Sequence, residues 1–150
     1  MQHEEIDISR LRVEDSEDFL SLSREFYSSD AVLHPVPDEY HISALHELLR
    51  SENYIVCYIF RCRGTTAGYA LIVKSYSREA GGTAIWIDEL YVRSEFRGRG
   101  IASRFFGLLF EEYPAARYRL ETEPDNIRAE SLYRRVGFTA LPYKQMCLDT

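Results

Sequence analysis

The chain has 150 residues, of which 45% are hydrophobic and 28% are charged, and its formal net charge is -6. This length and composition are typical of one globular domain, spanning residues 1–150. The negative charge argues against a nucleic-acid partner, and the longest apolar run, Ile55 to Phe60, is too short to cross a membrane. The three cysteines lack metal or redox spacing, which predicts reduced thiols in the cytoplasm.

Hydrophobic periodicity in the first two thirds of the chain predicts four strands and two helices. The segments expected to be strands are 6–13, 53–62, 66–76 and 83–92. The first helix is expected to start among the acids at 14–18 and to end at Ser28. The second is expected from about Asp38 to Arg50, after a loop that contains two prolines.

A glycine-rich loop leads into the next expected helix, over about 98–113. Gly98 and Gly100 let the backbone turn sharply and come close to a ligand. The first turn of a helix carries N–H groups that have no partner inside the helix. Those donors, the helix dipole and the charges of Arg97, Arg99 and Arg104 predict a phosphate site.

Two better-known phosphate loops are excluded. The chain has no Gly-Lys pair, which a P-loop requires, and Ser103 stands at the third glycine position of the dinucleotide fingerprint. The loop also fits an arginine-rich helix start on a solvated face, so by itself it leaves both interpretations open.

The last third of the chain predicts a strand, a helix and further strands. A helix separates the strand expected over 117–122 from the strand over 83–92, so the two should be parallel with a right-handed crossover. Pro124-Asp125-Asn126 opens the last helix, which ends at Gly137. Residues 138–148 are expected to form one or two final strands.

Two motifs resemble signatures of the GNAT superfamily of N-acetyltransferases. Arg97-x-x-Gly100-x-Ala102 resembles its Q/R-x-x-G-x-G/A signature, which holds the pyrophosphate of coenzyme A. In the second signature an Asn is followed by Ala and then by L-Y-x-x-x-G-F. The residues at these positions are Asn126, Ala129, Leu132, Tyr133, Gly137 and Phe138.

The resemblance implies a mixed α/β GNAT fold. Its central, mostly antiparallel sheet would have six to seven strands and about four flanking helices, with the parallel pair splayed to hold coenzyme A. It also implies an acyltransferase that passes the acetyl group of acetyl-CoA to a primary amine by direct attack in a ternary complex. The implied coenzyme-binding residues are Leu90, Tyr91, Val92, Arg97, Gly98, Arg99, Gly100, Ile101, Ala102, Asn126 and Tyr133.

Four residues are candidates for catalytic proton transfer: Tyr133, Glu121, Glu89 and Asp88. Tyr133 matches a family tyrosine that can act as the general acid, although helical spacing alone favours a core tyrosine bonded to a backbone carbonyl. The amine needs a base, for which Glu121, Glu89 and Asp88 hold positions used in the family. Successive strand residues face opposite sides, so Asp88 and Glu89 are not expected both to face the substrate. Each acid also fits an ordinary surface or salt-bridged carboxylate.

The acceptor is expected to bind near the first two helices and the loop between them. Aromatic and acidic residues there suit a small cationic amine or polyamine, although most also fit ordinary surface. They are Phe26, Tyr27, Asp30, His34, Asp38, Glu39 and Tyr40. Two alternatives stay open, namely acetylation of a protein N-terminus or lysine, and a non-catalytic acyl-CoA-binding regulatory module. The histidine spacing predicts no metal site. Many members of the superfamily are dimers, which makes a homodimer an open expectation.

Overall fold

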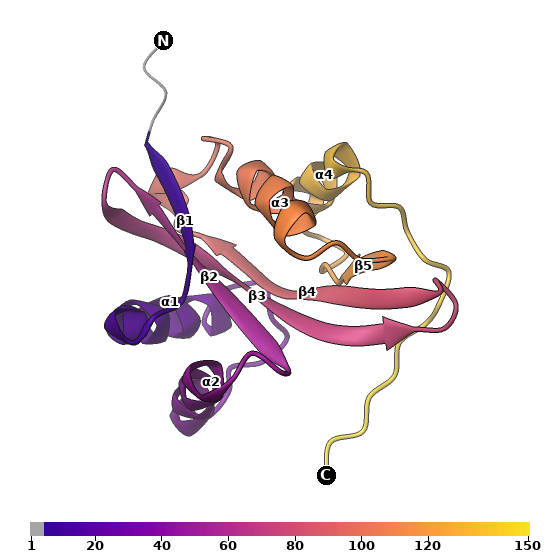
Figure 1. Ribbon diagram of the computed structural model, residues 1–150, viewed down its shortest axis with the longest axis horizontal. Helices are drawn as coiled ribbons and strands as arrows, with labels where there is room; N and C mark the ends of the chain where they lie inside the picture. Colours follow the sequence, from indigo (N-terminus) through magenta and orange to yellow (C-terminus); the bar gives the residue numbers. More distant parts are fainter. Residues whose placement is uncertain (1–4) are drawn as a thin grey trace.

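The computed structural model describes residues 5–150. Within this range, five strands form one sheet in the order β1-β2-β3-β4-β5. Helices α1 and α2 cover one face of the sheet, and α3 and α4 cover the other (Figure 1). The strands are β1 (Ile6–Arg10), β2 (Ile55–Cys62), β3 (Thr65–Ser77), β4 (Gly82–Val92) and β5 (Arg117–Leu120). The helices are α1 (Ser16–Tyr27), α2 (Asp38–Arg50), α3 (Ile101–Glu112) and α4 (Ile127–Val136), with short 3-10 turns η1 (Val13–Asp15) and η2 (Ser94–Phe96).

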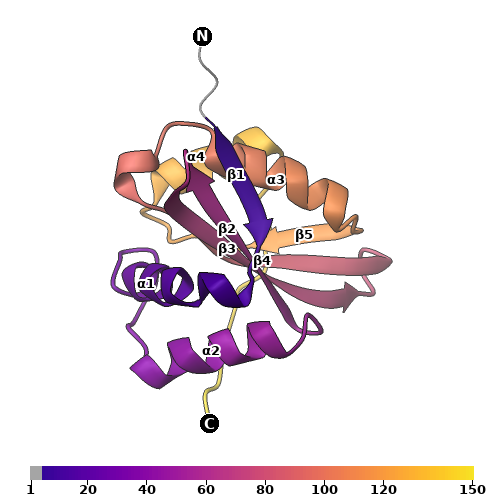
Figure 2. The same ribbon diagram turned by 60° about the vertical axis from the view of Figure 1, so that its left-hand side comes forward.

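Strands β1 to β4 pair antiparallel, whereas β4 and β5 are parallel, which confirms the predicted crossover through α3 (Figure 2). The parallel pairing runs from Ala84 opposite Arg117 to Ile87 opposite Leu120. Beyond Ile87, β4 continues to Val92 and stays paired with β3 on its other side. The end of β4 therefore presents one edge that pairs with no other described strand.

Two hydrophobic cores lie on opposite faces of the sheet. Alternate residues of β2 serve each of them, because side chains along a strand point to opposite sides. Tyr58 and Phe60 pack in the core below α3, where Phe105 is fully buried. Cys57 and Ile59 pack in the core formed with α1 and α2. This double burial fixes β2 and β3 as the centre of the fold.

A β-bulge interrupts β4 beside the end of the parallel pairing. Leu71 lies opposite Glu89 and Ile72 lies opposite Ile87, so Asp88 has no partner on β3. A bulge inserts one extra residue and bends the strand. The regular alternation that was expected to separate Asp88 from Glu89 therefore fails here.

The expected strands over 138–148 are absent, so the described sheet has five strands and not six or seven. Phe138 N donates to the Tyr133 carbonyl, but no backbone hydrogen bond joins residues 139–150 to the described part of the chain. The sequence of these residues indicates only that their backbone prefers an extended conformation. A strand also needs a partner edge, and residues 139–150 pair with neither edge strand of the described sheet, β1 or β5.

Candidate active site

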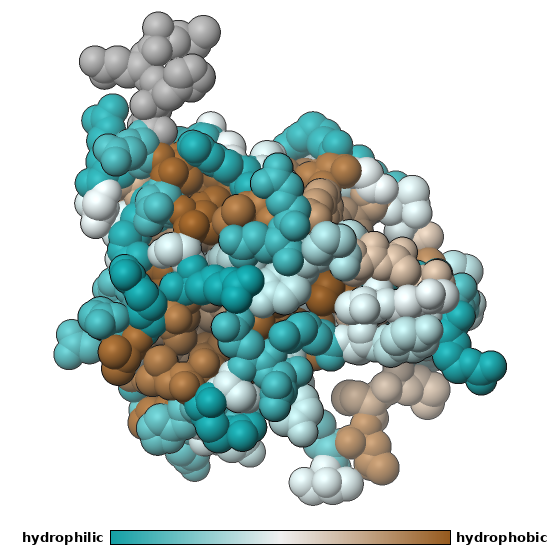
Figure 3. Space-filling model, in the orientation of Figure 1, coloured by the Kyte–Doolittle hydropathy of each residue, from teal (hydrophilic) through white to brown (hydrophobic). Residues whose placement is uncertain are grey.

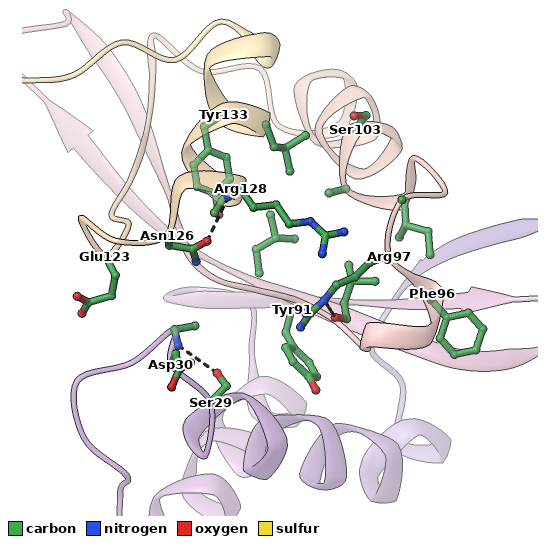
Figure 4. A pocket seen from close by; sticks show the side chains of 18 of the residues that line it. Ser29, Asp30, Tyr91, Phe96, Arg97, Ser103, Glu123, Asn126, Arg128 and Tyr133 are labelled. Carbon is green, nitrogen blue, oxygen red and sulfur yellow. Dashed lines mark hydrogen bonds between the residues drawn. The ribbon is translucent and has the colours of Figure 1, made fainter.

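A cleft of about 840 Å³ opens where β4 and β5 separate. Its walls come from the turn after α1, the end of β4, the glycine loop with the start of α3, and one side of α4 (Figure 4). Ten of the eleven predicted coenzyme-binding residues line it. They are Leu90, Tyr91, Val92, Arg97, Gly98, Gly100, Ile101, Ala102, Asn126 and Tyr133.

The glycine loop leaves its backbone accessible. Gly98 and Gly100 have φ angles of 78° and 81°, which favour glycine, and no atom lies within 4 Å of a Cβ built on either. Gly100 is the N-cap of α3 and gives no side-chain cap, so the first amides of the helix have no acceptor there. The expected helix start at Gly98 is therefore corrected to Ile101, because both glycines have non-helical backbones.

Three arginines line the cleft, Arg97, Arg128 and Arg135, and only Arg97 is among those expected. Arg97 lies in the loop, where its Nε donates to the Val92 carbonyl at 2.9 Å, and Arg128 reaches across from α4 (Figure 4). The Arg99 side chain instead stacks over Phe96 at 5.4 Å from the ring centroid and is absent from the cleft wall. Sequence reasoning missed Arg128, although its place in the first turn after the predicted N-cap was a usable signal.

Asn126 and Tyr133 sit on the α4 side of the cleft. The predicted N-cap is confirmed, since Asn126 Oδ1 accepts a hydrogen bond from Ala129 N at 3.2 Å. The Tyr133 ring packs against Phe106 and Phe138 with centroid distances of 6.2 and 6.1 Å. No hydrogen bond joins its hydroxyl to a residue within 5–150. The alternative interpretation of Tyr133, as a core tyrosine bonded to a backbone carbonyl, is therefore wrong. Burial raises the Tyr133 pKa, which keeps the hydroxyl protonated.

Glu89 is a buried carboxyl group held by a tyrosine. Its side chain points into the α1 side of the sheet, where the Tyr69 hydroxyl donates to Oε1 at 2.6 Å, and the residue is 8% exposed. Burial, together with the negative charge of Asp88, raises the pKa of Glu89 to about 7, against the opposing effect of the hydrogen bond from Tyr69. The group therefore titrates near neutral pH.

Asp88 precedes Glu89 on β4 and interacts with Glu121, and none of the three acids is part of the cleft lining. Burial raises the pKa of Asp88, and the charge of Glu121 adds to the shift. The pKa of Tyr27 is raised by burial and by the charges of both Glu89 and Asp88. The bulge thus places both neighbouring acids within electrostatic reach of one hydroxyl, contrary to the expectation from alternation.

The residues expected to bind the acceptor are only partly brought together. Asp30 lines the cleft and Tyr27 lies near the acids, but Phe26 is buried in the core, in edge contact with Tyr69 and Tyr91. Asp38 pairs with Arg24 at 2.7 Å. The remaining three, His34, Glu39 and Tyr40, are exposed. Among the described residues, no cluster of His, Cys, Asp and Glu has the arrangement of a metal site, and no helix is long and apolar enough to span a membrane.

A model of the Acetyltransferase (GNAT) family matches residues 16–138. The chain belongs to this family. It is an acyltransferase, and acetyl-CoA is its co-substrate. The exposed amides after Gly100 and the guanidinium groups of Arg97 and Arg128 suit the diphosphate of that co-substrate. The residues of the cleft therefore fit acetyl-CoA.

Solved structures share the GNAT fold at low sequence identity. A possible acetyltransferase from Clostridium difficile 630 has a TM-score of 0.81 and 17% identity, covering 97% of both chains. AAC(6')-Iy in complex with a bisubstrate analog has a TM-score of 0.76 and 18% identity, covering 95% of this chain and 99% of that one. A ribosomal-protein-alanine N-acetyltransferase from Brucella melitensis biovar Abortus 2308 has a TM-score of 0.74 and 21% identity, covering 97% and 100%. No curated protein matches the chain in sequence.

Gly100→Ala is expected to weaken coenzyme A binding at least tenfold, because its methyl group would stand between the α3 amides and the diphosphate. The matched control is Gly64→Ala, in the β2–β3 hairpin, where φ is 79° and no atom lies within 4 Å of the built Cβ. Both variants carry a similar strain of about 1–2 kcal/mol from a left-handed alanine. Titration calorimetry with coenzyme A separates them. Equal affinity losses in the two variants would exclude a specific role for the Gly100 loop.

Proposed function

We propose that the protein transfers the acetyl group of acetyl-CoA to the primary amine of a small cationic molecule or polyamine, by direct attack in a ternary complex. The observation that supports this acceptor is a group of three carboxyl groups, on Asp88, Glu89 and Glu121, beside the cleft. None of the three forms an ion pair with a residue in 5–150. A cluster of acids without a cation on the protein favours a ligand that brings positive charge.

The thioester supplies the electrophilic acetyl carbonyl, and the chain's groups do the remaining work. The first amides of α3, with Arg97 and Arg128, hold the diphosphate. The unpaired edge of β4 offers backbone groups around Leu90, Tyr91 and Val92, to which the pantetheine arm adds like a strand. The same edge supplies amide donors to the carbonyl oxygen as it gains negative charge.

Glu89 accepts the proton of the attacking amine, directly or through water. An alkylamine has a pKa of about 10.4, so removing its proton at neutral pH costs roughly 4 to 5 kcal/mol. A carboxyl group with a pKa of about 7 is a far stronger base than an ordinary glutamate, and a large fraction of it is ionised at neutral pH. Asp88 and Glu121 attract the cationic acceptor and are the competing candidates for the base.

Tyr133 donates a proton to the departing sulfur. Its hydroxyl has no partner in the described chain and belongs to the cleft wall, so it is available to a bound molecule. A phenol at its ordinary pKa would give its proton to a thiolate at a cost of about 2 kcal/mol, and burial increases that cost. The positive ends of α3 and α4 stabilise the negative sulfur and lessen it.

Two alternative functions are also tested by the experiments below. Acetylation of a protein N-terminus or lysine is the first, and one structural relative is a ribosomal-protein-alanine N-acetyltransferase. A non-catalytic acyl-CoA-binding regulatory module is the second, and the presence of Tyr133 with the three acids argues against it. We place the protein in the cytoplasm, and the three cysteines, which form no disulfide in the described chain, support this. We also propose a homodimer.

An amine panel is expected to show a preference for di- and triamines. Because the carboxylate cluster attracts the distal ammonium group, kcat/KM for a diamine should exceed that for the monoamine of equal length at least tenfold. Release of the free coenzyme thiol measures turnover. Faster turnover of peptides than of any small amine would favour the protein acetyltransferase, and coenzyme binding without turnover on any amine would favour the regulatory module.

Glu89→Gln is expected to lower turnover about 100-fold and to abolish the rise of kcat/KM with pH near 7. The folded pKa of Glu89 lies above the ordinary 4.5, so the folded state binds more protons between pH 4.5 and 7, and stability falls as pH rises through that range. The variant should therefore melt at a higher temperature than wild type at pH 8, where its free energy of unfolding should be larger by at most about 3 kcal/mol. At pH 5 the difference should be smaller.

Tyr69→Phe is the companion variant in that experiment. It removes the hydrogen bond that lowers the Glu89 pKa, so the inflection of kcat/KM should move to higher pH while the maximum rate is largely kept. Wild-type turnover in Glu89→Gln at pH 8, with the inflection unchanged, would assign the base to another group.

Tyr133→Phe is expected to lower kcat at least tenfold while coenzyme affinity and melting temperature stay nearly unchanged. The ring contacts with Phe106 and Phe138 persist in the variant, and no protein hydrogen bond is lost. Tyr76→Phe, at an exposed tyrosine on β3, is the control for loss of a hydroxyl. Steady-state kinetics and calorimetry measure the two quantities. An unchanged kcat would remove Tyr133 from the acid role.

A further inference from the structure

The end of β4 is held by a single described strand. Residues 88–92 lie beyond the parallel pairing with β5, which stops at Ile87. On the other side they face β3, where Gly68 lies opposite Val92 and Tyr69 lies opposite Tyr91. A strand end with one neighbouring strand shifts more easily than one held between two. Whatever fixes this end therefore decides where the free backbone edge of β4 lies in the cleft.

Position 68 requires glycine because of space and not because of backbone conformation. The φ angle of Gly68 is not one of the positive angles that favour glycine elsewhere in the described chain. A Cβ built on Gly68 would instead overlap the Tyr91 carbonyl oxygen and lie 2.9 Å from the Val92 Cα, both on β4. The missing side chain therefore lets β3 and the end of β4 approach each other closely.

Of these two strands, β3 is the less able to move. It lies between β2 and β4, and Tyr69 and Ala70 are fully buried on opposite faces of the sheet. The end of β4 has an open side instead, where Tyr91 and Val92 form part of the cleft lining. A side chain at position 68 would therefore displace Tyr91 and Val92 into the cleft.

Arg93, the residue after β4, ties the strand end to both β3 and α1. Its backbone N donates to the Ala67 carbonyl at 2.8 Å, and its Nη1 donates to the Thr66 carbonyl at 3.1 Å. Its Nη2 pairs with Glu25 Oε2 at 2.7 Å, and its Nε donates to Oε1 at 3.0 Å. The Tyr91 hydroxyl also donates to Glu25, at 3.3 Å. One carboxylate on α1 thus holds two residues at the end of β4.

The pair of Arg93 with Glu25 is partly withdrawn from water. Figure 3 shows hydrophilic side chains spread over the surface of the molecule, whereas the side chains of Arg93 and Glu25 are 24% and 36% exposed. The hydrogen bonds from Arg93 lower the pKa of Glu25, so its carboxylate stays charged at neutral pH. A charged pair with two hydrogen bonds fixes geometry more firmly than an ordinary surface pair.

We propose that Gly68, Arg93 and Glu25 are positioning residues for acetyl transfer. They fix the end of β4, so that its free edge meets the pantetheine arm in one register and the thioester lies beside Tyr133. None of the three is part of the cleft lining, so they act through the strand end that is. The inference rests on the proposed addition of the pantetheine arm to β4.

Two ligands distinguish a displaced strand edge from a damaged phosphate loop. Coenzyme A uses both the edge and the loop, whereas the 3′-phosphorylated ADP that remains without the pantetheine arm uses the loop alone. Gly68→Ala is expected to weaken coenzyme A binding about tenfold, equivalent to one or two backbone hydrogen bonds, and to leave the affinity for the nucleotide unchanged. Titration calorimetry measures both affinities.

Gly82→Ala is the matched control for this variant. Gly82 is the first residue of β4, at the opposite end of the strand from Val92. Its φ angle is also not positive, and a Cβ built on it lies 3.1 Å from the Ala116 Cβ. This variant should bind both ligands as wild type does. Circular dichroism checks that each variant is folded.

Glu25→Gln tests the same role without adding an atom next to β4, and it decides the question if Gly68→Ala does not fold. Loss of the charge weakens the hold on Arg93, so coenzyme A binding should fall about threefold while nucleotide binding is unchanged. Glu47→Gln is its control, because Glu47 forms a comparable pair with Arg50 on α2, at 2.7 Å. The control should change neither affinity.

The wild-type protein shows whether the edge is used at all. If it binds coenzyme A no more tightly than the nucleotide, the proposed addition of the arm to β4 fails, and the positioning role fails with it. If wild type prefers coenzyme A, and the folded variants keep that preference or lose affinity for both ligands equally, only the positioning role is overturned.

Discussion

The parallel pairing of β4 with β5 stops at Ile87, and the candidate active site depends on that stop. A sheet that stayed fully paired would have no room for a ligand between these strands and no free backbone groups at the end of β4. Because the pairing ends, the strands separate, and the cleft opens between the starts of α3 and α4. Both helices then direct their positive ends toward the same space. One interrupted ladder thus creates the cavity, the exposed strand edge and the converging dipoles.

The bulge at Asp88 lies next to this stop and gives the site its acid–base character. It rotates the end of β4, so that Glu89 enters the core beside Tyr69 and Asp88 stays near the opening. Burying a carboxyl group disfavours its charged form, and a neighbouring carboxylate adds to the effect. The buried carboxylate therefore destabilises the folded protein at neutral pH, and in return its pKa of about 7 makes it a useful base. That conflict between stability and a useful pKa is typical of catalytic groups.

Within the described chain, the same sheet has a second unpaired edge, on the outer side of β5. Residues 139–150, after α4, are exposed and form no strand. Backbone groups at such an edge bond to water and can pair with another extended chain, whereas apolar side chains left in water are unfavourable. Residues 139–150 follow α4, the helix that also forms one side of the cleft.

The sequence by itself determined the features that local rules control. Glycines at 98 and 100 predicted the turn and the exposed amides, Asn126 predicted the cap of α4, and the two motifs predicted the family. Tertiary structure alone decided the bulge that brings Asp88 and Glu89 together, the replacement of Arg99 by Arg128 in the cleft wall, and the absence of strands after Phe138. Caps and turns depend on neighbouring residues along the chain, whereas register and strand partners depend on residues far apart, whose positions no local pattern fixes.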